Sequence, residues 1–332
     1  MKITVVIPVR NEEESLPVLL DSLLSQTRRP DEIVITDGGS TDRTPQIIEK
    51  YIERGAPIRL VRAEMALPGR GRNLGAQCAS SEWLAFTDGG MLVAPDWLAG
   101  LAERGERDDV DIVYGAVEPI IDTLFKECAA IAYVSPPREN NGTYHRPPSV
   151  ASALIRRSVW QAVGGFPEHL RSAEDILFMN KVSDAKSRTV FAPDAKVYWT
   201  PQPTFWRTFR RFFTYSRHNL KAGLAGQWHV RIFAQYAIIF ISGLPALAFG
   251  WRWWVAATIA LWLLALTARS IVSIIRNRRC HPAGAFRNAA RTATIVPLLA
   301  VIDLGTFLGT ISWLVRDKLN LGSASVGTSN GA

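Results

Sequence analysis

Short apolar runs alternate with segments of helical periodicity over the first 90 residues. The strands predicted from these runs are residues 3–9, 32–36, 58–62 and 83–87. Helices are expected between them, because the leucines of residues 16–24 recur at helical spacing and residues 45–53 and the segment from Arg70 continue the alternation. Such alternation predicts a parallel sheet with right-handed crossovers. Ligands of such sheets bind beyond the carboxyl ends of the strands, where the turns at 37–42 and 87–90 fall.

The order of elements changes from about residue 110. The predicted strands are residues 110–117, 150–156 and 188–199, and the predicted helices are residues 122–134 and 173–184. The segment 135–149 is rich in Pro, Asn and Gly, which predicts a mobile loop. We therefore expect an α/β fold class, a mixed sheet flanked by helices, for the N-terminal part of the chain.

The last third of the chain carries long apolar segments. Residues 232–250 and 253–275 are each about 20 residues long, which matches about 30 Å of hydrocarbon when helical. A tryptophan-rich turn, WRWW, lies between them and predicts a hairpin with Trp251, Trp253 and Trp254 at the far membrane interface.

A third apolar segment, residues 293–315, contains Pro297 and Asp303. A carboxyl group within a span is costly and faces protein or water. A full span is the favoured interpretation, and a re-entrant or surface helix is the alternative. The Gly- and Ser-rich tail 319–332 is expected to be disordered.

Residues 204–224 combine an aromatic face with a basic face. The aromatic and apolar positions at helical spacing are Phe205, Phe209, Phe212, Phe213 and Leu220, and the basic ones are Arg207, Arg210, Arg211, Arg217 and Lys221. This pattern is typical of a helix that lies in a lipid headgroup layer. The alternative is an ordinary amphipathic helix docked on the core, but the apolar segment that follows directly favours the interface.

Composition and charge support a soluble part joined to a membrane part. The 332 residues are 48% hydrophobic and 20% charged, which excludes a disordered or collagen-like chain. The formal net charge is +8, and the excess lies in acid-free stretches at 207–221 and 276–291, beside the apolar segments. Anionic lipid headgroups are therefore a better partner than nucleic acid. The positive-inside rule then predicts that the soluble part is cytoplasmic.

Two further features bear on the compartment. The cysteines Cys78, Cys128 and Cys280 are odd in number and lack metal-ligand spacing, which indicates neither a disulfide framework nor a zinc site. The N-terminal apolar run is too short for a signal peptide and is followed by Arg10 and three glutamates. The predicted organisation is a cytoplasmic domain at 1–203, an interfacial helix at 204–230, a membrane domain at 231–318 and the tail.

Four motifs, in order, resemble those of family 2 glycosyltransferases. They are IPVRNEEESLPVLLDSLLSQ, EIVITDGGSTDRT, GRGRNLGAQCASSEWLAFTDGG and ALIRRSVWQAVGGFPEHLRSAEDILFMNKV, and the resemblance covers about residues 2–220. The GGSTD variant and the basic aromatic helix are most similar to the membrane-anchored, exopolysaccharide-type bacterial subgroup. The resemblance implies the GT-A fold, inverting transfer from a nucleotide-sugar and a bacterial inner membrane.

The resemblance also implies a nucleotide site. Asp37 matches an Asp that contacts the nucleobase, and its carboxylate at a strand end can accept the N–H of a uracil-type base. The other residues that match nucleotide-binding positions are Pro8, Arg10, Glu12, Arg72, Asn73 and Asp88. A turn-forming role is the alternative for Asp37, and a solvated helix start is the alternative for Arg72 and Asn73. Asp42 is expected to cap the following helix.

Asp88 matches the first acid of the family's metal motif, Asp-any-Asp, which holds Mg²⁺ or Mn²⁺ on the donor diphosphate. Gly90 stands where the second acid is expected, so the motif is incomplete. Such a divalent cation needs hard oxygen ligands. When bound, it stabilises the negative charge on the departing diphosphate. Phosphate oxygens, water and His145 are candidates for the remaining ligands.

The Glu174–Asp175 pair matches the acids that supply the family's general base. Inverting transfer needs a carboxylate that takes the acceptor hydroxyl proton. Asp175 is the predicted base, and Glu174 is the neighbour that orients it or contacts the acceptor. First-turn acids favoured by the helix dipole are the alternative.

The predicted function is transfer of a sugar, from a UDP-sugar in the first instance, to a polyprenyl-phosphate-linked or glycolipid acceptor in envelope or exopolysaccharide assembly. Arg207, Arg210 and Arg211 would lie near the acceptor phosphates. Arg207 and Arg210 have the spacing of a motif of processive synthases, but Arg211 replaces its Trp. A processive polysaccharide synthase and a catalytically weak nucleotide-sugar-binding membrane protein are the alternatives.

Overall fold

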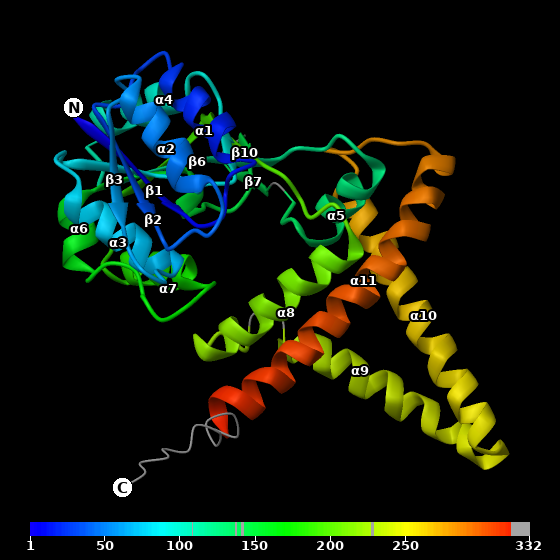
Figure 1. The fold of residues 1–332 in the computed structure, drawn as a ribbon. Helices are drawn as coiled ribbons and strands as arrows, with labels where there is room; N and C mark the ends of the chain where they lie inside the picture. The colour runs from blue at the N-terminus through cyan, green and yellow to red at the C-terminus, as the bar shows by residue number, and fades with distance from the viewer. Residues whose placement is uncertain (108, 137, 141–142, 227–228, 320–332) are drawn as a thin grey trace, which may run out of the picture. The chain divides into compact units, whose positions relative to one another are not determined.

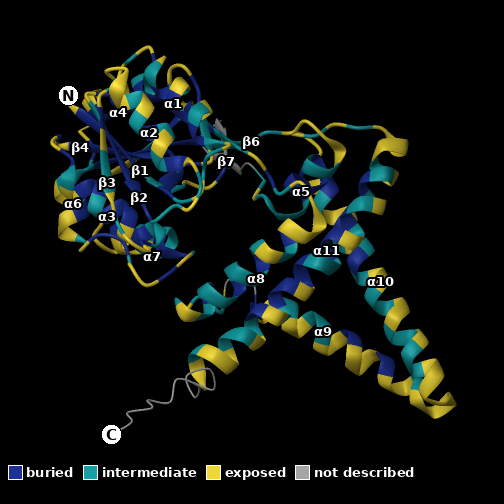
Figure 2. Ribbon diagram, in the orientation of Figure 1, coloured by how far each residue is buried: buried dark blue, intermediate teal, exposed yellow. Residues whose placement is uncertain are grey.

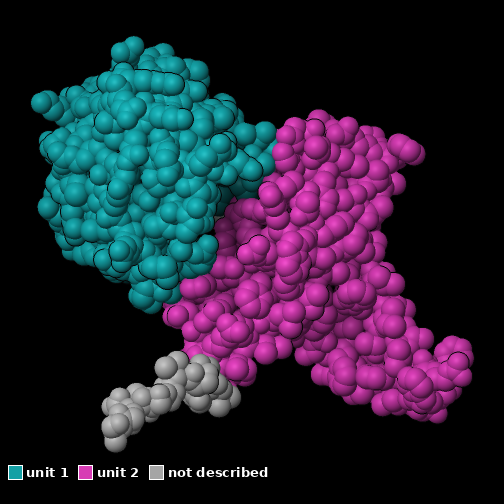
Figure 3. Space-filling view, in the orientation of Figure 1, with its two compact units in different colours: residues 1–120, 137–200 teal, residues 121–136, 201–332 magenta. Residues whose placement is uncertain are grey.

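The computed structural model describes residues 1–319 except 108, 137, 141–142 and 227–228, and these residues form two compact units (Figure 3). The first unit comprises residues 1–120 and 137–200. The second comprises residues 121–136 and the chain from residue 201. The predicted tail falls, except for Leu319, outside the described residues.

An eight-stranded mixed sheet of order β3-β2-β1-β4-β9-β6-β10-β5 forms the first unit (Figure 1). Its strands are β1 (Ile3–Val9), β2 (Glu32–Asp37), β3 (Ile58–Arg62), β4 (Trp83–Phe86), β5 (Met91–Val93), β6 (Ile112–Pro119), β9 (Ala153–Arg156) and β10 (Thr189–Trp199). The predicted parallel block β3-β2-β1-β4 is confirmed. Strand β9 runs antiparallel to both β4 and β6, which makes the sheet mixed.

Two parts of the fold differ from the sequence-based expectation. The short strand β5 pairs antiparallel with β10 and closes one edge of the sheet. The segment predicted as a mobile loop contains a two-stranded hairpin, β7 (Arg138–Asn140) with β8 (Thr143–His145). Three-residue strands carry too few positions for a period of two to be recognised, so both were missed.

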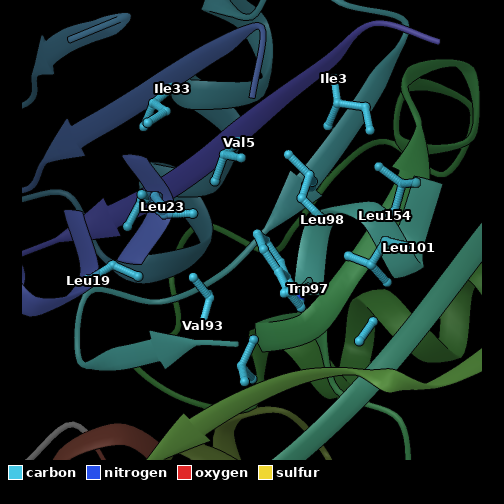
Figure 4. Packing of buried hydrophobic residues seen from close by; sticks show 14 of the residues in the cluster. Ile3, Val5, Leu19, Leu23, Ile33, Val93, Trp97, Leu98, Leu101 and Leu154 are labelled. Carbon is cyan, nitrogen blue, oxygen red and sulfur yellow. The ribbon is translucent and has the colours of Figure 1, made fainter. Parts of the chain in front are cut away.

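The helices of the first unit pack against both faces of the sheet. Figure 4 shows the buried cluster on one of these faces, to which Val5, Leu19 and Leu23 belong. They are α1 (Leu16–Leu24), α2 (Thr44–Glu53), α3 (Pro68–Cys78), α4 (Trp97–Arg107), α6 (Arg157–Ala162) and α7 (Glu174–Asp184). Alternate residues of β1 face opposite layers, because side chains of a strand have a period of two. Val5 packs in one cluster with Leu19 and Leu23, whereas Val6 packs in the other with Phe86. This double burial explains the unbroken apolar sequence of β1.

The second unit is helical. Its helices are α5 (Leu124–Tyr133), α8 (Phe205–Lys221), α9 (His229–Gly243) with a 3₁₀ continuation at Leu244–Phe249, α10 (Trp251–Arg276) and α11 (Ala285–Trp313). Among the described residues, three helical segments are long and apolar enough to cross a membrane: His229–Phe249, Trp251–Arg276 and Ala285–Lys318. The first two leave most of their apolar surface exposed (Figure 2). The third continues through Pro297 as one helix that is long enough for the predicted full span, which stays a prediction.

The carboxyl group of Asp303 within the third segment is paired. Arg269 of α10 donates two hydrogen bonds to it, at 2.6 and 3.1 Å, and the Tyr236 hydroxyl of α9 donates a third at 2.9 Å. Asp303 is fully buried. The three candidate spans therefore share one polar contact, which satisfies a charge that lipid could not.

Close packing of α8 on α11 depends on small residues. A Cβ at Gly305 would come within 2.9 Å of the Phe209 carbonyl oxygen, and one at Gly309 within 2.5 Å of the Phe213 carbonyl oxygen. Ser216 of α8 donates a hydrogen bond to the Thr306 carbonyl oxygen at 2.8 Å. The amphipathic helix 205–221 is thus packed on a candidate span through one face, as small-residue contacts between helices allow.

Helix α5 was predicted within the N-terminal domain, but it belongs to the second unit. Its Cys128 and Ile131 are in one buried cluster with Ile295 of α11. Glu127 of the same helix forms ion pairs with Arg287 and with Arg291, which is 1% exposed. The boundary was missed because an isolated ten-residue helix does not reveal which core it joins.

Replacement of Glu127 by Ala should strongly destabilise the second unit. Arg291 would stay buried without its carboxylate, and removal of one partner of a buried pair costs about 3–5 kcal/mol. Thermal unfolding of the full-length protein in detergent would measure the change. Asp122→Asn is the control, because Asp122 pairs with Lys126 at the surface and should change the unfolding temperature little. Equal unfolding temperatures for the two variants would contradict the role of the buried pair.

Candidate active site

The predicted nucleotide-binding residues lie at the carboxyl ends of the parallel strands. Asp37 is the last residue of β2 and pairs in register with Val9 of β1, and Asp88 follows β4 by two positions. Pro8 is in β1, and α3 packs closely on it, since a Cβ at Gly71 would come within 2.9 Å of the Pro8 Cβ. The edge of the sheet predicted to bind ligand is therefore the edge at which these residues gather.

Asp37 is buried at the start of the turn that follows β2. Its Oδ1 accepts hydrogen bonds from the Ser40 backbone N–H at 3.0 Å and from the Ser40 hydroxyl at 2.6 Å. These bonds fix the turn and hold the carboxylate in one orientation, so the turn-forming role of Asp37 is present in the structure. Its predicted contact with a nucleobase would use Oδ2, because both of these hydrogen bonds are made by Oδ1.

Arg72 joins the donor-side acid to the acceptor-side acid. Its Nη2 donates to Asp88 Oδ1 at 2.6 Å, and its Nη1 donates to Glu174 Oε1 at 2.7 Å. The side chains of Arg72 and Glu174 are 5% and 6% exposed, whereas that of Asp88 is 34% exposed. Only the Asp88 end of this chain of charges is therefore open to a ligand.

Arg72 is also held by an aromatic ring. Its guanidinium carbon lies 5.4 Å from the centre of the Phe166 ring, and Phe166 stacks on Phe178 of α7 at 4.0 Å between ring centres. This cation–π contact fixes the plane of the guanidinium group. Phe166 was not among the predicted site residues, although an aromatic residue directly after a double-glycine turn is a signal for such a contact.

Asn73 holds the loop that carries Phe166. Its Oδ1 accepts from the Phe166 N–H at 2.9 Å and from Trp160 Nε1 at 3.2 Å, and its Nδ2 donates to the Phe166 carbonyl oxygen and to Glu168 Oε1 at 2.9 and 2.8 Å. These four bonds satisfy the amide. Gly165 has a φ of +65°, and a Cβ there would lie 2.6 Å from Asn73 Oδ1. Asn73 thus positions the loop, and its predicted contact with a nucleotide stays a prediction.

The two predicted catalytic acids occupy the first turn of α7. The preceding residue, Ala173, has a φ of +73°, a strained conformation for a residue with a side chain. Asp175 Oδ1 accepts a hydrogen bond from the Ile176 N–H at 2.8 Å. The strained residue turns the chain so that Glu174 points to Arg72 and Asp175 follows it at the helix start.

Burial and charge change the protonation of this cluster. Burial raises the pKa of Glu174, and the nearby Asp175 adds to the effect, while Arg72 opposes it. Burial likewise raises the pKa of Asp175 against the attraction of Arg72. Burial alone would lower the pKa of Arg72, but the charges of Asp88, Glu174 and Asp175 outweigh it, so Arg72 remains a cation. A carboxylate whose pKa lies above its usual range is suited to accept a proton.

The residues fit a divalent cation only in part. Among the described residues no group of three or more His, Cys, Asp or Glu side chains could hold a metal ion. Asp88 is a hard oxygen donor that is open to a ligand. Burial raises the pKa of Glu12, and the nearby charge of Asp88 raises it further, so the two carboxyl groups are close to each other. A cation held here would take its other ligands from a bound diphosphate and water. The His145 side chain, a predicted alternative ligand, lies outside the described residues.

The remaining predicted residues lie at the surface of their units. Arg10 is partly exposed, and its Nη2 contacts the Met65 sulfur at 3.8 Å. Arg207 and Arg210 are exposed on α8 of the second unit. The Arg211 guanidinium lies over the rings of Tyr215 and Tyr133, with centres 5.0 and 6.0 Å away. The basic face of α8 is therefore present, with one arginine held against aromatic rings.

A curled mixed sheet with acids at the ends of β2 and β4 is the GT-A arrangement of sugar transferases. Residues 4–167 match the model of the family described as glycosyl transferase family 2. This chain is a family 2 glycosyltransferase, and it is therefore a transferase enzyme.

Curated relatives support this assignment. Glycosyltransferase AglE of Haloferax volcanii is 25% identical over 250 residues, which are 73% of this chain and 81% of AglE. The poly(ribitol-phosphate) beta-N-acetylglucosaminyltransferase TarS of Staphylococcus aureus is 27% identical over 215 residues, or 60% of this chain. This chain covers about a third or less of the length of TarS and of several other relatives.

Solved structures share the fold. The mannosyltransferase PcManGT from Pyrobaculum calidifontis, in complex with GDP-Man and Mn²⁺, has a TM-score of 0.57 at 21% identity, covering 95% of this chain and 88% of that one. TarS residues 1–349 in complex with UDP-GlcNAc have a TM-score of 0.51 at 19% identity, covering 94% of this chain and 91% of that one.

Replacement of Arg72 by Met should move the acidic limb of the pH profile to higher pH. Arg72 lowers the pKa of Asp175, so loss of the cation lets that pKa rise further, and the basic form is then reached only at higher pH. A shift of about one pH unit or more is expected in kcat/KM. Arg72→Lys keeps the charge and should keep the limb, and exposed Arg70→Met is the matched control. An unchanged limb in Arg72→Met would contradict this coupling.

Proposed function

We propose that this glycosyltransferase transfers a sugar, with inversion, from a nucleotide-sugar to a lipid-linked acceptor at the cytoplasmic face of a bacterial inner membrane. The observation that carries the proposal is the connection of Asp88, at the predicted donor diphosphate, to Glu174 through Arg72. The donor-side acid Asp88 and the acceptor-side acid Glu174 are thus both paired with the buried guanidinium group of Arg72. Such a cluster positions the two reactants of a group transfer relative to each other.

The donor half of the proposal rests on the ends of β1, β2 and β4. Asp37 would accept an N–H of the base, and Arg10 and Glu12 would line the nucleoside pocket. A UDP-sugar is the proposed donor, and a GDP-sugar is its competitor, because guanine also presents N–H groups to a carboxylate. TarS was solved with UDP-GlcNAc and PcManGT with GDP-Man, so both donor classes occur on this fold.

In the proposed chemical step, Asp175 is the general base. The acceptor hydroxyl attacks the anomeric carbon, its proton passes to the Asp175 carboxylate, and the bond from the anomeric carbon to the nucleoside diphosphate breaks. The raised pKa of Asp175 suits this transfer. A bound divalent cation would supply charge stabilisation to the departing diphosphate, and Asp88 would hold it. Glu174, fixed by Arg72, would orient the base.

The acceptor half of the proposal rests on the second unit. Three candidate spans follow the basic helix α8, whose exposed Arg207 and Arg210 suit anionic headgroups and lipid-linked phosphates. The basic segment 276–291 lies between the last two candidate spans, on the side that the positive-inside rule makes cytoplasmic. TarS is named for a poly(ribitol-phosphate) acceptor, so a relative of this chain acts on an anionic polymer of phosphates.

We favour addition of a single sugar over processive synthesis. The three candidate spans found among the described residues offer little material for a polymer channel. Arg211 replaces the acceptor-stacking Trp of processive enzymes, and it lies against Tyr215 and Tyr133. A long product from the purified protein would overturn this choice.

Replacement of Asp175 by Asn should abolish most of the transfer without loss of donor binding. Asn cannot accept the hydroxyl proton, and general base catalysis contributes about 10²–10⁴-fold to rate. Single-turnover transfer and equilibrium nucleotide binding, measured on the same full-length protein, separate the two effects. Asp184→Asn, at the exposed end of the same helix, is the control. Full turnover by Asp175→Asn would remove Asp175 as the base.

A donor panel should identify one active nucleotide-sugar. Full-length protein in detergent is tested for release of nucleoside diphosphate from UDP-, GDP- and dTDP-sugars, with Mg²⁺, Mn²⁺ or EDTA, and with or without bacterial lipid extract. We expect release from one donor, loss of release with EDTA and stimulation by lipid, because the acceptor resides in the membrane. Donor binding without release under all conditions would contradict the proposed transfer.

A further inference from the structure

The incomplete metal motif raises the question of which group replaces its second acid. Gly90 stands where that acid is expected, and its φ lies outside the left-handed region that requires glycine. A Cβ added at Gly90 would meet only one heavy atom within 4 Å, and that contact would be of ordinary van der Waals length. Neither backbone conformation nor crowding therefore explains the glycine.

The single neighbour of that added Cβ is a carboxylate oxygen. Glu12 Oε2 lies 3.7 Å from the position that the Cβ of residue 90 would take. The stem of Glu12 runs along the preceding residue, since a Cβ at Gly89 would lie 3.0 Å from Glu12 Cγ. A carboxylate carried by residue 90 and the carboxylate of Glu12 would thus occupy the same small region beside Asp88.

Glu12 is held in this position by its own surroundings. Its backbone N–H donates to Thr44 Oγ1 at 2.8 Å, and its Oε2 accepts a hydrogen bond from the Ser15 hydroxyl. It follows β1 within three residues, so the sheet fixes its backbone next to the end of β4. Side chains fixed in this way lose little freedom when they bind an ion.

We infer that Glu12 supplies the second carboxylate of the divalent-cation site, in place of the acid missing at residue 90. The inference rests on the proposed function, because the cation is the one expected on the donor diphosphate. Asp88 and Glu12 then approach the cation from β4 and from the segment after β1. Two carboxylates do not saturate a hard cation, so the nucleotide diphosphate must complete its coordination. Cation binding should accordingly depend on nucleotide.

The test measures Mn²⁺ binding directly. The sharp electron paramagnetic resonance signal of free Mn²⁺ is followed as full-length protein in detergent is titrated, with UDP, with GDP and without nucleotide. Glu12→Gln keeps an oxygen for the Ser15 hydrogen bond and removes only the charge. We expect its Mn²⁺ affinity in the presence of nucleotide to fall by about ten-fold or more. Exposed Glu14→Gln, two residues away, is the matched control and should bind Mn²⁺ as the wild type does.

A second variant tests the position of the charge. Glu12→Gln combined with Gly90→Asp moves the carboxylate to residue 90, and Mn²⁺ affinity should recover toward the wild-type value. Unchanged Mn²⁺ affinity in Glu12→Gln would overturn the inference. Equal loss of nucleotide affinity with Mn²⁺ and with EDTA would also overturn it, because Glu12 would then serve only to line the nucleoside pocket and would not bind the cation.

The wild-type protein separates this inference from the proposed function. Failure of the wild type to bind either nucleotide, with or without Mn²⁺, would overturn both. Nucleotide binding and sugar transfer by the wild type, together with unchanged Mn²⁺ affinity in Glu12→Gln, would overturn only the role of Glu12.

Discussion

The buried guanidinium of Arg72 imposes the main constraint on the active-site unit. It must neutralise Glu174 and reach Asp88 at once, so α3, α7 and the turn after β4 cannot move independently. Loss of Arg72 would leave the buried Glu174 carboxyl group without its cation, which is strongly unfavourable in a low-dielectric interior. The loop held by Asn73 supports this contact, because it places the Phe166 ring 5.4 Å from the guanidinium carbon.

The second unit uses the same principle in two more places. Asp303 and Arg269 join candidate membrane spans, and Glu127 and Arg291 join α5 to the start of α11. In each case a buried charge has a partner on another helix, so the pairing fixes which helices are neighbours. Buried ion pairs contribute less to stability than their Coulomb attraction suggests, but they penalise every arrangement that separates them.

A missing acid in a motif does not imply a missing function. Residue 90 lacks a carboxylate, yet the segment after β1 brings Glu12 to the same region. The distance along the chain between Glu12 and Asp88 is large, and only the parallel pairing of β1 with β4 makes them neighbours. A motif read along the sequence cannot register such a replacement, since it compares residues only at fixed spacing.

The pattern of apolar and polar residues was enough to predict the parallel block of the sheet and the three apolar segments. It also determined the acids at the strand ends, because periodicity and strand ends are local properties of the chain. It could not determine that Asn73 holds a loop, that α5 joins the helical unit, or that Arg72 pairs with Glu174, 102 residues away. The short strands β5, β7 and β8 were likewise not predicted from the sequence. These features depend on contacts between residues far apart in the sequence, and such side chains come to share a buried space only when the chain has folded.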